Sequence, residues 1–380
     1  MEYELGELLP YEQPADYIVE LTDYDDSYKT PVLTAGKSFI IGYTNETKGI
    51  YTKLPVIIFD DFTTSSQYVD FPFKVKSSAM KILSVNSEIA DLKYLFYKMQ
   101  TIQFDSANHK RYWISEYSKI KLDLPTLAEQ QRIVNRIETM FAKLDQAQEK
   151  AQTVLDSFET RKAAILHKAF NGQLKIDNEE LSIEDWEDTT IGECCRLGSG
   201  GTPSKSHPEY YENGDIPWLK TGEIDWNDIY DVEERITNEG VENSSAKIFP
   251  AESVVVAMYG MGVTRGKAAI IKIPTATNQA VCVLQPNEKL NNRFLFYYFM
   301  CNYWQIREQS VGGNQLNLSG KIIASFPIKL PPLNYQLSIV NFLDTVLEKE
   351  SRAKETSQTV LDQIALLKKS ILARAFRGEL

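Results

Sequence analysis

The chain has 380 residues, of which 43% are hydrophobic, and a formal net charge of −11 at pH 7. This length accommodates two or three domains with sizeable cores, and the acidic charge argues against a partner held by net charge alone, such as nucleic acid. The four cysteines follow no disulfide or zinc-knuckle spacing, no apolar run reaches the roughly 18 residues of a membrane span, and the acidic, proline-containing N-terminus is no signal peptide. We therefore expect a cytoplasmic protein.

Residues 1–123 predict a globular, strand-rich domain. Short β-branched and aromatic runs, such as PVIIF at 55–59 and FPFKV at 71–75, are separated by Gly, Pro, Asn and Asp. One helix is expected late in the segment, over DLKYLFYKMQ at 91–100.

Residues 124–174 predict one long helix. Pro125 ends the preceding strand-like run, and Thr126 and Glu129 have the spacing of a capping box. The apolar positions then alternate steps of four and three residues, which is typical of a coiled-coil seam, and Gly172 ends the helix. The predicted seam comprises Ile133, Ile137, Met140, Leu144, Ala147, Ala151, Val154 and Phe158.

Residues 175–185 are acidic and unpatterned and predict a linker, and residues 186–329 predict a second strand-rich domain. Its strand-like runs include SVVVAM at 253–258 and AAIIKI at 268–273. A helix is expected late in this domain as well, over NRFLFYYFMC at 292–301.

Residues 330–380 repeat residues 124–174 at an offset of 206 without a gap, and 23 of the 51 aligned positions are identical. A repeat at this distance indicates that a domain-sized unit is duplicated. The fronts of the two globular segments match weakly, LGE at 5–7 against IGE at 191–193, and elsewhere the two segments differ greatly. The apolar seam of the second copy comprises Ile339, Leu343, Val346, Ala353, Val360 and Ile364, with Glu350 and Ser357 as polar interruptions.

So narrow an apolar seam needs a partner helix. We therefore predict an α+β fold in which two strand-rich domains are separated by a pair of long antiparallel coiled-coil helices with pseudo-two-fold symmetry. The alternative is that each helix packs on its own globular domain.

Acidic and basic segments alternate in both halves of the chain. Residues 1–28 hold nine acids and no Lys or Arg, whereas residues 29–123 hold nine acids and thirteen bases. Residues 176–242 hold nineteen acids and four bases, whereas residues 243–330 hold three acids and nine bases. The basic segments are compatible with a phosphate-facing surface, and ordinary solvated faces would give the same counts.

The sequence contains no recognised catalytic, nucleotide-binding or metal-binding motif, which favours a chain without catalytic residues or a metal. GSGGTPSKS at 198–206 is glycine-rich enough to bring backbone amides to a phosphate, although a simple loop between strands explains it as well. Asp60 and Asp61 are interpreted as structural residues, or as acceptors for a cytosine amino group.

Polar and basic residues on turns are the candidates for contact with DNA, because Arg, Asn and Gln bind base edges and Lys binds phosphate. For each of them a solvated loop is the alternative. In the first domain the candidates are Lys37, Thr44, Asn45, Lys74, Lys76, Lys110 and Arg111. In the second domain they are Thr202, Ser204, Lys205, Lys220, Thr264, Arg265, Lys267, Asn314, Gln315, Asn317 and Lys321.

Over essentially its whole length the chain resembles the specificity (S) subunit of type I restriction–modification systems. The resemblance rests on a variable domain followed by a repeated helix, twice. Its motifs are LPTLAEQQRIV with ILHKAFNGQL in the first copy, LPPLNYQLSIV with ILARAFRGEL in the second, and GGTPSKSHPEYYENGDIPWLKTGEI at 200–224.

The resemblance implies that each globular segment is a target recognition domain for one half of a split sequence in double-stranded DNA. Residues 124–172 and 331–378 would form the spacer and dock two modification (M) subunits, which carry S-adenosylmethionine and methylate adenine. Restriction (R) subunits would add translocation and cleavage driven by ATP with Mg. The S subunit itself would be non-catalytic and would bind no cofactor.

One departure from the repeat bears on the docking of the M subunits. Glu129 and Gln131 of the first copy are replaced by Tyr335 and Leu337 in the second. Equal strength of the two docking sites therefore does not follow from the repeat. A different class of function, a coiled-coil adaptor whose globular ends bind proteins, would give no DNA binding even with an M subunit present.

Overall fold

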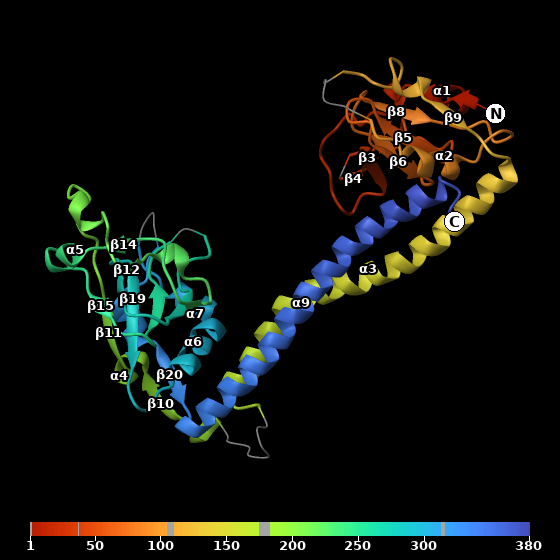
Figure 1. Ribbon diagram of the computed structural model, residues 1–380. Helices are drawn as coiled ribbons and strands as arrows, with labels where there is room; N and C mark the ends of the chain where they lie inside the picture. Colours follow the sequence, from red (N-terminus) through yellow and green to blue (C-terminus); the bar gives the residue numbers. More distant parts are fainter. Residues whose placement is uncertain (1, 37, 105–109, 175–182, 261, 313–315) are drawn as a thin grey trace. The chain divides into compact units, whose positions relative to one another are not determined.

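A computed structural model of the chain describes residues 2–36, 38–104, 110–174, 183–260, 262–312 and 316–380 (Figure 1). The chain divides into two compact units, residues 1–153 with 357–380 and residues 154–356. Each unit contains one strand-rich domain, the beginning of one long helix and the end of the other. No helix in the described ranges combines the length and apolar character that a membrane span requires.

The two long helices are α3 (Leu127–Phe170) and α9 (Leu333–Ala375). Both end as the sequence predicts, because Gly172 and Gly378 adopt left-handed φ values of 65° and 76°. In both, the amide of the residue after the glycine reaches back to the last turn, from Gln173 to Lys168 at 3.1 Å and from Glu379 to Arg374 at 3.0 Å.

The helices run antiparallel to each other within each unit (Figure 1). In the first unit Ile137 of α3 packs with Leu372 and Ala375 of α9. In the second unit Arg161 of α3 forms an ion pair with Glu350 of α9 at 2.8 Å. Every predicted seam position in both copies is buried or half-buried, so the prediction of a paired seam is confirmed. Glu350 is one of the two polar positions of the second seam, and its carboxylate pairs with Arg161.

The first strand-rich domain contains two main sheets, with orders β2-β8-β5-β6 and β4-β3-β7, and β1 pairs with β9. Its elements are β1 (Glu2–Glu4), α1 (Leu5–Leu8), β2 (Tyr11–Glu12), β3 (Thr30–Leu33), β4 (Ile40–Thr44), β5 (Val56–Asp60), β6 (Ser66–Val69), β7 (Lys74–Val75), β8 (Met80–Leu83), α2 (Leu92–Met99) and β9 (Lys121–Asp123).

The second strand-rich domain has main sheets of order β11-β19-β16-β17-β13 and β14-β12-β18-β15, and β10 pairs with β20. Its strands are β10 (Glu187–Thr190), β11 (Cys195–Ser199), β12 (Ile216–Leu219), β13 (Asp228–Ile229), β14 (Arg235–Ile236), β15 (Ile248–Phe249), β16 (Val254–Ala257), β17 (Ala268–Ile271), β18 (Thr275–Thr277), β19 (Val281–Pro286) and β20 (Pro327–Leu330). Its helices are α4 (Ile191–Cys194), α5 (Asn238–Glu242), α6 (Asn292–Cys301), α7 (Tyr303–Glu308) and α8 (Gly320–Ser325).

The two domains share one topology. The antiparallel series β2-β8-β5-β6 corresponds to β11-β19-β16-β17, and the series β4-β3-β7, with its parallel β3–β7 pair, corresponds to β14-β12-β18. The LGE and IGE tripeptides occupy equivalent places. Each begins a one-turn helix, α1 or α4, whose N-terminus has a capping box. The duplication therefore includes the globular domains, although their sequences differ greatly outside these tripeptides.

A buried glutamine near the start of each long helix joins that helix to its domain in the same way. Gln130 is fully buried; its Oε1 accepts from the amide of Asp91 at 2.8 Å, and its Nε2 donates to the carbonyls of Ile89 and Pro125 at 3.2 and 2.9 Å. Asp91 is the N-cap residue of α2, so the glutamine fixes the start of α3 against the start of α2.

Gln336 repeats this arrangement in the second unit. Its Oε1 accepts from the amide of Asn291, the N-cap residue of α6, at 2.9 Å. Its Nε2 donates to the carbonyls of Lys289 and Pro331 at 2.8 and 2.9 Å. The end of the other long helix packs on the same domain, through Phe376 against Tyr94 in the first unit and Phe170 against Phe294 in the second, at ring distances of 5.2 and 5.0 Å.

Replacement of Gln130 by leucine is expected to lower the free energy of unfolding of the first unit by about 2–4 kcal/mol, because one buried amide and two carbonyls lose their partner. Gln131→Leu, at the neighbouring exposed position, is the matched control and should change it by less than about 0.5 kcal/mol. Urea denaturation followed by circular dichroism measures both. Equal midpoints for the two variants would contradict the anchoring role of Gln130.

Candidate nucleic-acid interface

In the first domain, three loop segments meet at the end of the sheets where β3 and β5 finish. The amide of Lys76 donates to the carbonyl of Leu33 at 3.1 Å, and the amide of Asp61 donates to the carbonyl of Ala79 at 2.9 Å. The amide of Tyr112 donates to the carbonyl of Asp61 at 2.8 Å. Residues 60–65, 76–79 and 110–113 thus form one surface, the first loop cluster.

In the second domain, loops gather at the corresponding end of the sheets. The amide of Gly200 donates to Thr277 Oγ1 at 3.1 Å, and the amide of Met258 donates to the carbonyl of Ala280 at 2.9 Å. The amide of Leu318 donates to the carbonyl of Met258 at 3.0 Å. The second loop cluster comprises residues 200–206, 258–260, 262–267, 278–280 and 316–318.

The two clusters are topologically equivalent. The first follows β5 and the second follows β16, which occupy the same place in the duplicated sheet. In each, a segment from after the late helix donates a backbone hydrogen bond to the turn after this strand, from Tyr112 in one case and from Leu318 in the other. Equivalent scaffolds therefore carry unlike loops.

Several predicted contacts of the first domain lie in the first loop cluster. Lys76 and Arg111 are exposed, and Lys110 is exposed and forms an ion pair with Glu116. Lys37 lies outside the described residues. Asn45 is exposed but follows β4 beside Thr30, which is the opposite end of β3 from the cluster.

Two predictions for this domain are wrong, because the side chains are not accessible. Lys74 is 3% exposed; its ammonium forms an ion pair with Glu46 at 2.5 Å and donates to the carbonyl of Lys48 at 2.9 Å. Thr44 is 2% exposed at the end of β4. Phe73 and Val75, the neighbours of Lys74, are also buried, but the pairing of Lys74 with Glu46 is a tertiary contact that the local sequence does not reveal.

In the second domain the loop after β11 is the most open part of the cluster. Thr202, Ser204 and Lys205 are exposed, and the Thr202 hydroxyl donates to Gln279 Oε1 at 2.6 Å. Lys220 lies at the same end, because the amide of Asn278 donates to the carbonyl of Leu219, and its ammonium forms an ion pair with Glu234 at 2.5 Å.

The remaining predicted residues of this domain differ in accessibility. Lys267 forms an ion pair with Asp225, and Lys321 is exposed on α8. Thr264 is half-buried in the turn after β16, and Asn317 is half-buried with its Oδ1 buried and without a partner among the described residues. Asn314 and Gln315 lie outside the described residues.

Arg265 joins two loops of the second cluster. Its guanidinium donates to the carbonyl of Leu316, while Arg307 donates to the carbonyls of Arg265 and Gly262. Arg307, which the sequence analysis missed, lies over the ring of Tyr303 at 5.1 Å. Burial, and then the neighbouring Arg307, lower the pKa of Arg265. No carboxylate in the described ranges pairs with either guanidinium, so the loop junction retains positive charge.

In the first domain the turn after β5 is held by Asp61. Asp61 and Lys81 are each 1% exposed and form an ion pair at 3.2 Å, and Asp61 Oδ1 also accepts from the amide of Trp113 at 2.7 Å. Asp60 Oδ1 accepts from the amides of Phe62 and Thr63, both at 2.9 Å. The interpretation of Asp60 and Asp61 as structural residues is therefore confirmed.

No group of three or more His, Cys, Asp and Glu side chains among the described residues is placed to hold a metal ion. Burial raises the pKa of the Cys195 and Cys282 thiols to about 12, so neither supplies a thiolate near neutral pH.

Two domains of one topology, each joined to a pair of long helices and each carrying a loop cluster with polar and basic residues, define a duplicated binding protein. A model of the family described as Type I restriction modification DNA specificity domain matches residues 1–155 and 183–362. The chain belongs to this family and is a specificity subunit of a type I restriction–modification system.

Relatives and solved structures agree with this assignment. The chain is 37% identical over 358 residues to the EcoR124I/EcoR124II specificity subunit of Escherichia coli, covering 90% of this chain and 85% of the relative. It is 23% identical over 314 residues to the StySPI specificity subunit of Salmonella potsdam, covering 79% and 66%.

Two solved structures share the fold over the full length of this chain. One comes from work on complex assembly and conformational transition of the type I R-M system; its TM-score is 0.71 at 17% identity, and 98% of it is covered. The other is the HsdS subunit from Thermoanaerobacter tengcongensis, with a TM-score of 0.60 at 18% identity and 97% covered. The predicted fold class and family are thus confirmed, and the adaptor alternative is not favoured.

Proposed function

We propose that this specificity subunit reads a bipartite sequence in double-stranded DNA, one half-site with each loop cluster. It catalyses nothing itself. Two M subunits dock along the helix pair and bind S-adenosylmethionine for adenine methylation, and R subunits join through them and use ATP with Mg. This chain binds none of these cofactors.

The observation that carries the proposal is the contrast between like scaffolds and unlike loops. The helices keep 23 of 51 residues and the same glutamine anchors, and the sheets keep one topology. The loop clusters at equivalent sheet ends share neither sequence nor length. Two readers of different base sequences need such an arrangement, because the side chains at base edges must differ while their supports stay alike.

The net charge of −11 indicates that the chain does not bind DNA tightly by itself. The exposed bases of the clusters, such as Lys76, Arg111 and Lys205, supply only a few phosphate contacts. We therefore expect the M subunits to supply much of the remaining phosphate contact.

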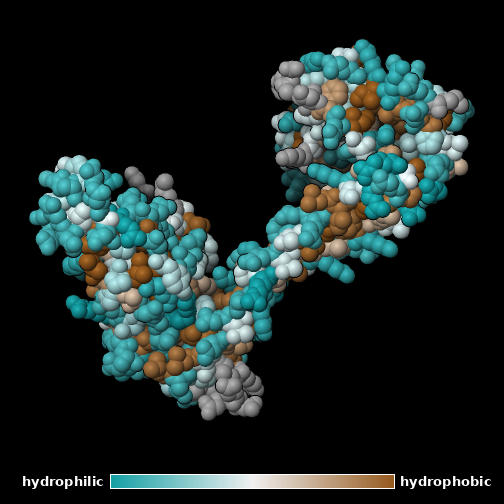
Figure 2. Space-filling model, viewed as in Figure 1, coloured by the Kyte–Doolittle hydropathy of each residue, from teal (hydrophilic) through white to brown (hydrophobic). Residues whose placement is uncertain are grey.

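The helix pair offers exposed apolar positions for partner subunits, and Figure 2 shows hydrophobic residues on its surface. Leu337 and Leu366 on α9 are 44% and 66% exposed, whereas their equivalents in the repeat are Gln131 and Thr160. Exposed leucines on a helix face favour association with another protein. The difference between the copies supports two docking sites of unequal strength.

Selection from a random DNA library by the purified complex of this chain with its M subunit tests the proposal. The expected result is two enriched blocks of fixed sequence separated by a constant, unselected gap. Enrichment of one uninterrupted block, or no enrichment while the complex stays assembled, would contradict it. The second of these outcomes is the one an adaptor predicts.

Arg265→Ala is expected to relax discrimination at one position of the second half-site by about 1–3 kcal/mol, the range for one good base contact. Part of this loss would come from the loop itself, because the Arg265 guanidinium also donates a hydrogen bond to the carbonyl of Leu316. Competition binding with single-base variants of the target measures the effect.

Arg235→Ala is the matched control, because Arg235 is exposed and lies beside Pro217, at the other end of β12 from the cluster. This variant should leave discrimination unchanged at every base position of the target. An unchanged profile for Arg265→Ala as well would remove Arg265 from the interface.

A further inference from the structure

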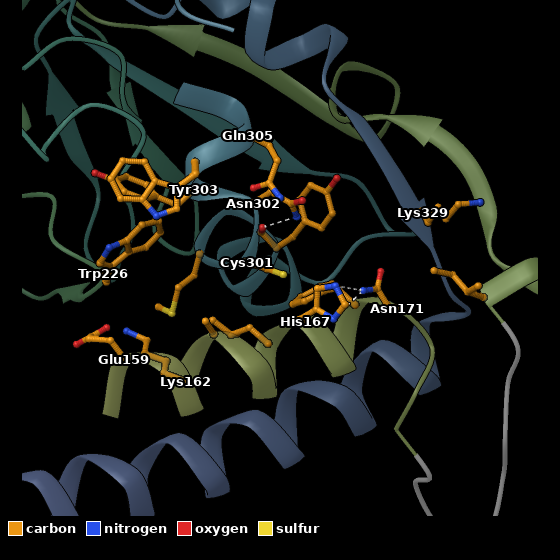
Figure 3. Close-up of a pocket in the computed structure, with 17 residues that line it drawn as sticks. Glu159, Lys162, His167, Asn171, Trp226, Cys301, Asn302, Tyr303, Gln305 and Lys329 are labelled. Atoms are coloured by element: carbon orange, nitrogen blue, oxygen red, sulfur yellow. Dashed lines mark hydrogen bonds between the residues drawn. The ribbon is translucent and has the colours of Figure 1, made fainter. Parts of the chain in front are cut away.

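A cleft of about 690 Å³ lies in the second unit, between the last turns of α3 and the helices α6 and α7 (Figure 3). Large apolar and aromatic side chains dominate its lining. They are Phe170, Trp226, Tyr298, Met300, Tyr303 and Trp304. Figure 3 shows Lys162 and Trp226 at one end of the cleft, and His167 and Asn171 towards the other.

Lys162 enters this cleft without a partner. Among the described residues, none forms a hydrogen bond or an ion pair with its ammonium. The two nearby carboxylates are already paired, Glu159 with Lys354 at 3.8 Å and Asp225 with Lys267. Three lysines thus face two carboxylates, and one positive charge is left over.

The pKa of Lys162 agrees with this geometry. It is lowered, chiefly because the cleft removes water from the ammonium; Lys354 and Lys267 add to the lowering, and Glu159 and Asp225 oppose it. A half-buried ammonium in this position gains from any carboxylate brought to it, since opposite charges attract more strongly where water is excluded.

The internal repeat supplies a comparison within the chain. Lys162 aligns with Lys368, whose ammonium binds Asp145 and Gln148 of α3 and lies 5.7 Å from the ring centre of Phe141. At the positions that correspond to Asp145 and Gln148, α9 carries Ser351 and Lys354. The chain therefore neutralises the lysine in the first unit and leaves it unneutralised in the second.

We propose that the cleft around Lys162 is a docking site for a segment of the M subunit that places an aspartate or glutamate beside a large apolar side chain. The inference rests on the proposed assembly with M subunits and adds where one of them is held. The carboxylate pairs with Lys162, and the apolar side chain packs among the rings of Trp226, Tyr303 and Trp304.

The chemistry of the lining selects this occupant. Trp304 is 65% exposed, and exposed tryptophans in aromatic clefts often contribute most to a protein interface. A nucleic acid is disfavoured, because the cleft offers one unpaired ammonium and a mainly apolar floor rather than a series of bases. Since Lys368 already has its acid, the site exists in one unit only, so the two M subunits are held unequally.

Native mass spectrometry of the chain with its M subunit, over a dilution series, tests the proposal. Wild type is expected to bind two M subunits. Lys162→Glu should weaken the second by at least tenfold and leave the first unchanged, and Lys162→Arg should bind like wild type. Lys247→Glu, at an exposed lysine of the same unit that lies outside the helix pair and does not line the cleft, is the control and should change binding by less than twofold.

Equal behaviour of Lys162→Glu and Lys247→Glu would overturn the docking site and leave the proposed function intact. Failure of wild type to bind any M subunit would overturn the proposed function and the docking site together.

A second readout, photocrosslinking, does not depend on the charge variants. With p-benzoylphenylalanine in place of Trp304, illumination of the purified complex should link an M peptide that contains Asp or Glu within four residues of the attachment. Linkage to a peptide without an acid, or no linkage, would overturn the docking site.

Discussion

Lys81→Met is expected to destabilise the first domain by about 3–5 kcal/mol, because it leaves the buried carboxylate of Asp61 without its counter-charge. Both side chains of this pair are 1% exposed, and Asp61 also holds the amide of Trp113. The turn after β5 and the segment 110–113 should therefore loosen together. Hydrogen exchange of peptides from β5 and β8, measured by mass spectrometry, gives the change in opening free energy.

Two controls separate the charge effect from lost packing. The double variant Asp61→Asn with Lys81→Met removes both charges and should recover part of the loss. Lys121→Met, which breaks the exposed pair with Glu2, should cost less than about 1 kcal/mol. In the complex with M, Lys81→Met should weaken reading of the first half-site and spare the second. Equal loss at both half-sites would contradict the division of labour between the clusters.

Removal of one heptad from each long helix is expected to shorten the unread spacer and leave both half-sites unchanged. The pair is antiparallel, with Asp145 opposite Lys368, so residues 146–152 face residues 361–367. Seven helical residues span about 10.5 Å at 1.5 Å each. With a rise of about 3.4 Å per base pair, the spacer should lose about three base pairs. The methylated motif of cells that carry the shortened chain measures this directly.

Removal of residues 146–152 alone is the control for this experiment. Each domain grips the start of one helix and the end of the other, through Gln130 with Phe376 and through Gln336 with Phe170. A deletion in one helix alone shifts the two seams against each other by one heptad. The contacts at both ends of the pair can then no longer form together, so the folded complex should be lost. New half-sites with an unchanged spacer after the paired deletion would refute the role of the helices as the spacer.

The helix pair was predictable because its signals are local and repeated. The four-three spacing, the terminal glycines and the identity between the copies all depend on residues close in sequence. The shared topology of the domains was not, because the parallel β3–β7 and β12–β18 pairs join segments that are distant in the chain and unlike in sequence.

Single site residues were less predictable than the loops that carry them. The glycine-rich turns singled out in the sequence lie together in the second cluster, but turn composition does not reveal which side chains are used in contacts within the fold. Lys74 forms a buried ion pair with Glu46, and the Arg265 guanidinium donates to the carbonyl of Leu316. Both contacts join residues that are distant in the sequence. The contrast between Lys162 and Lys368 needs both the repeat and the antiparallel register to be known.

The most direct measurement is single-molecule sequencing of N6-methyladenine in the genome of cells that express this chain with its M subunit. Our account predicts one motif of two short specified blocks, separated by a fixed number of unspecified base pairs and fully methylated. A motif without a gap, or no methylation despite an assembled complex, would contradict the reading of DNA by two separate loop clusters.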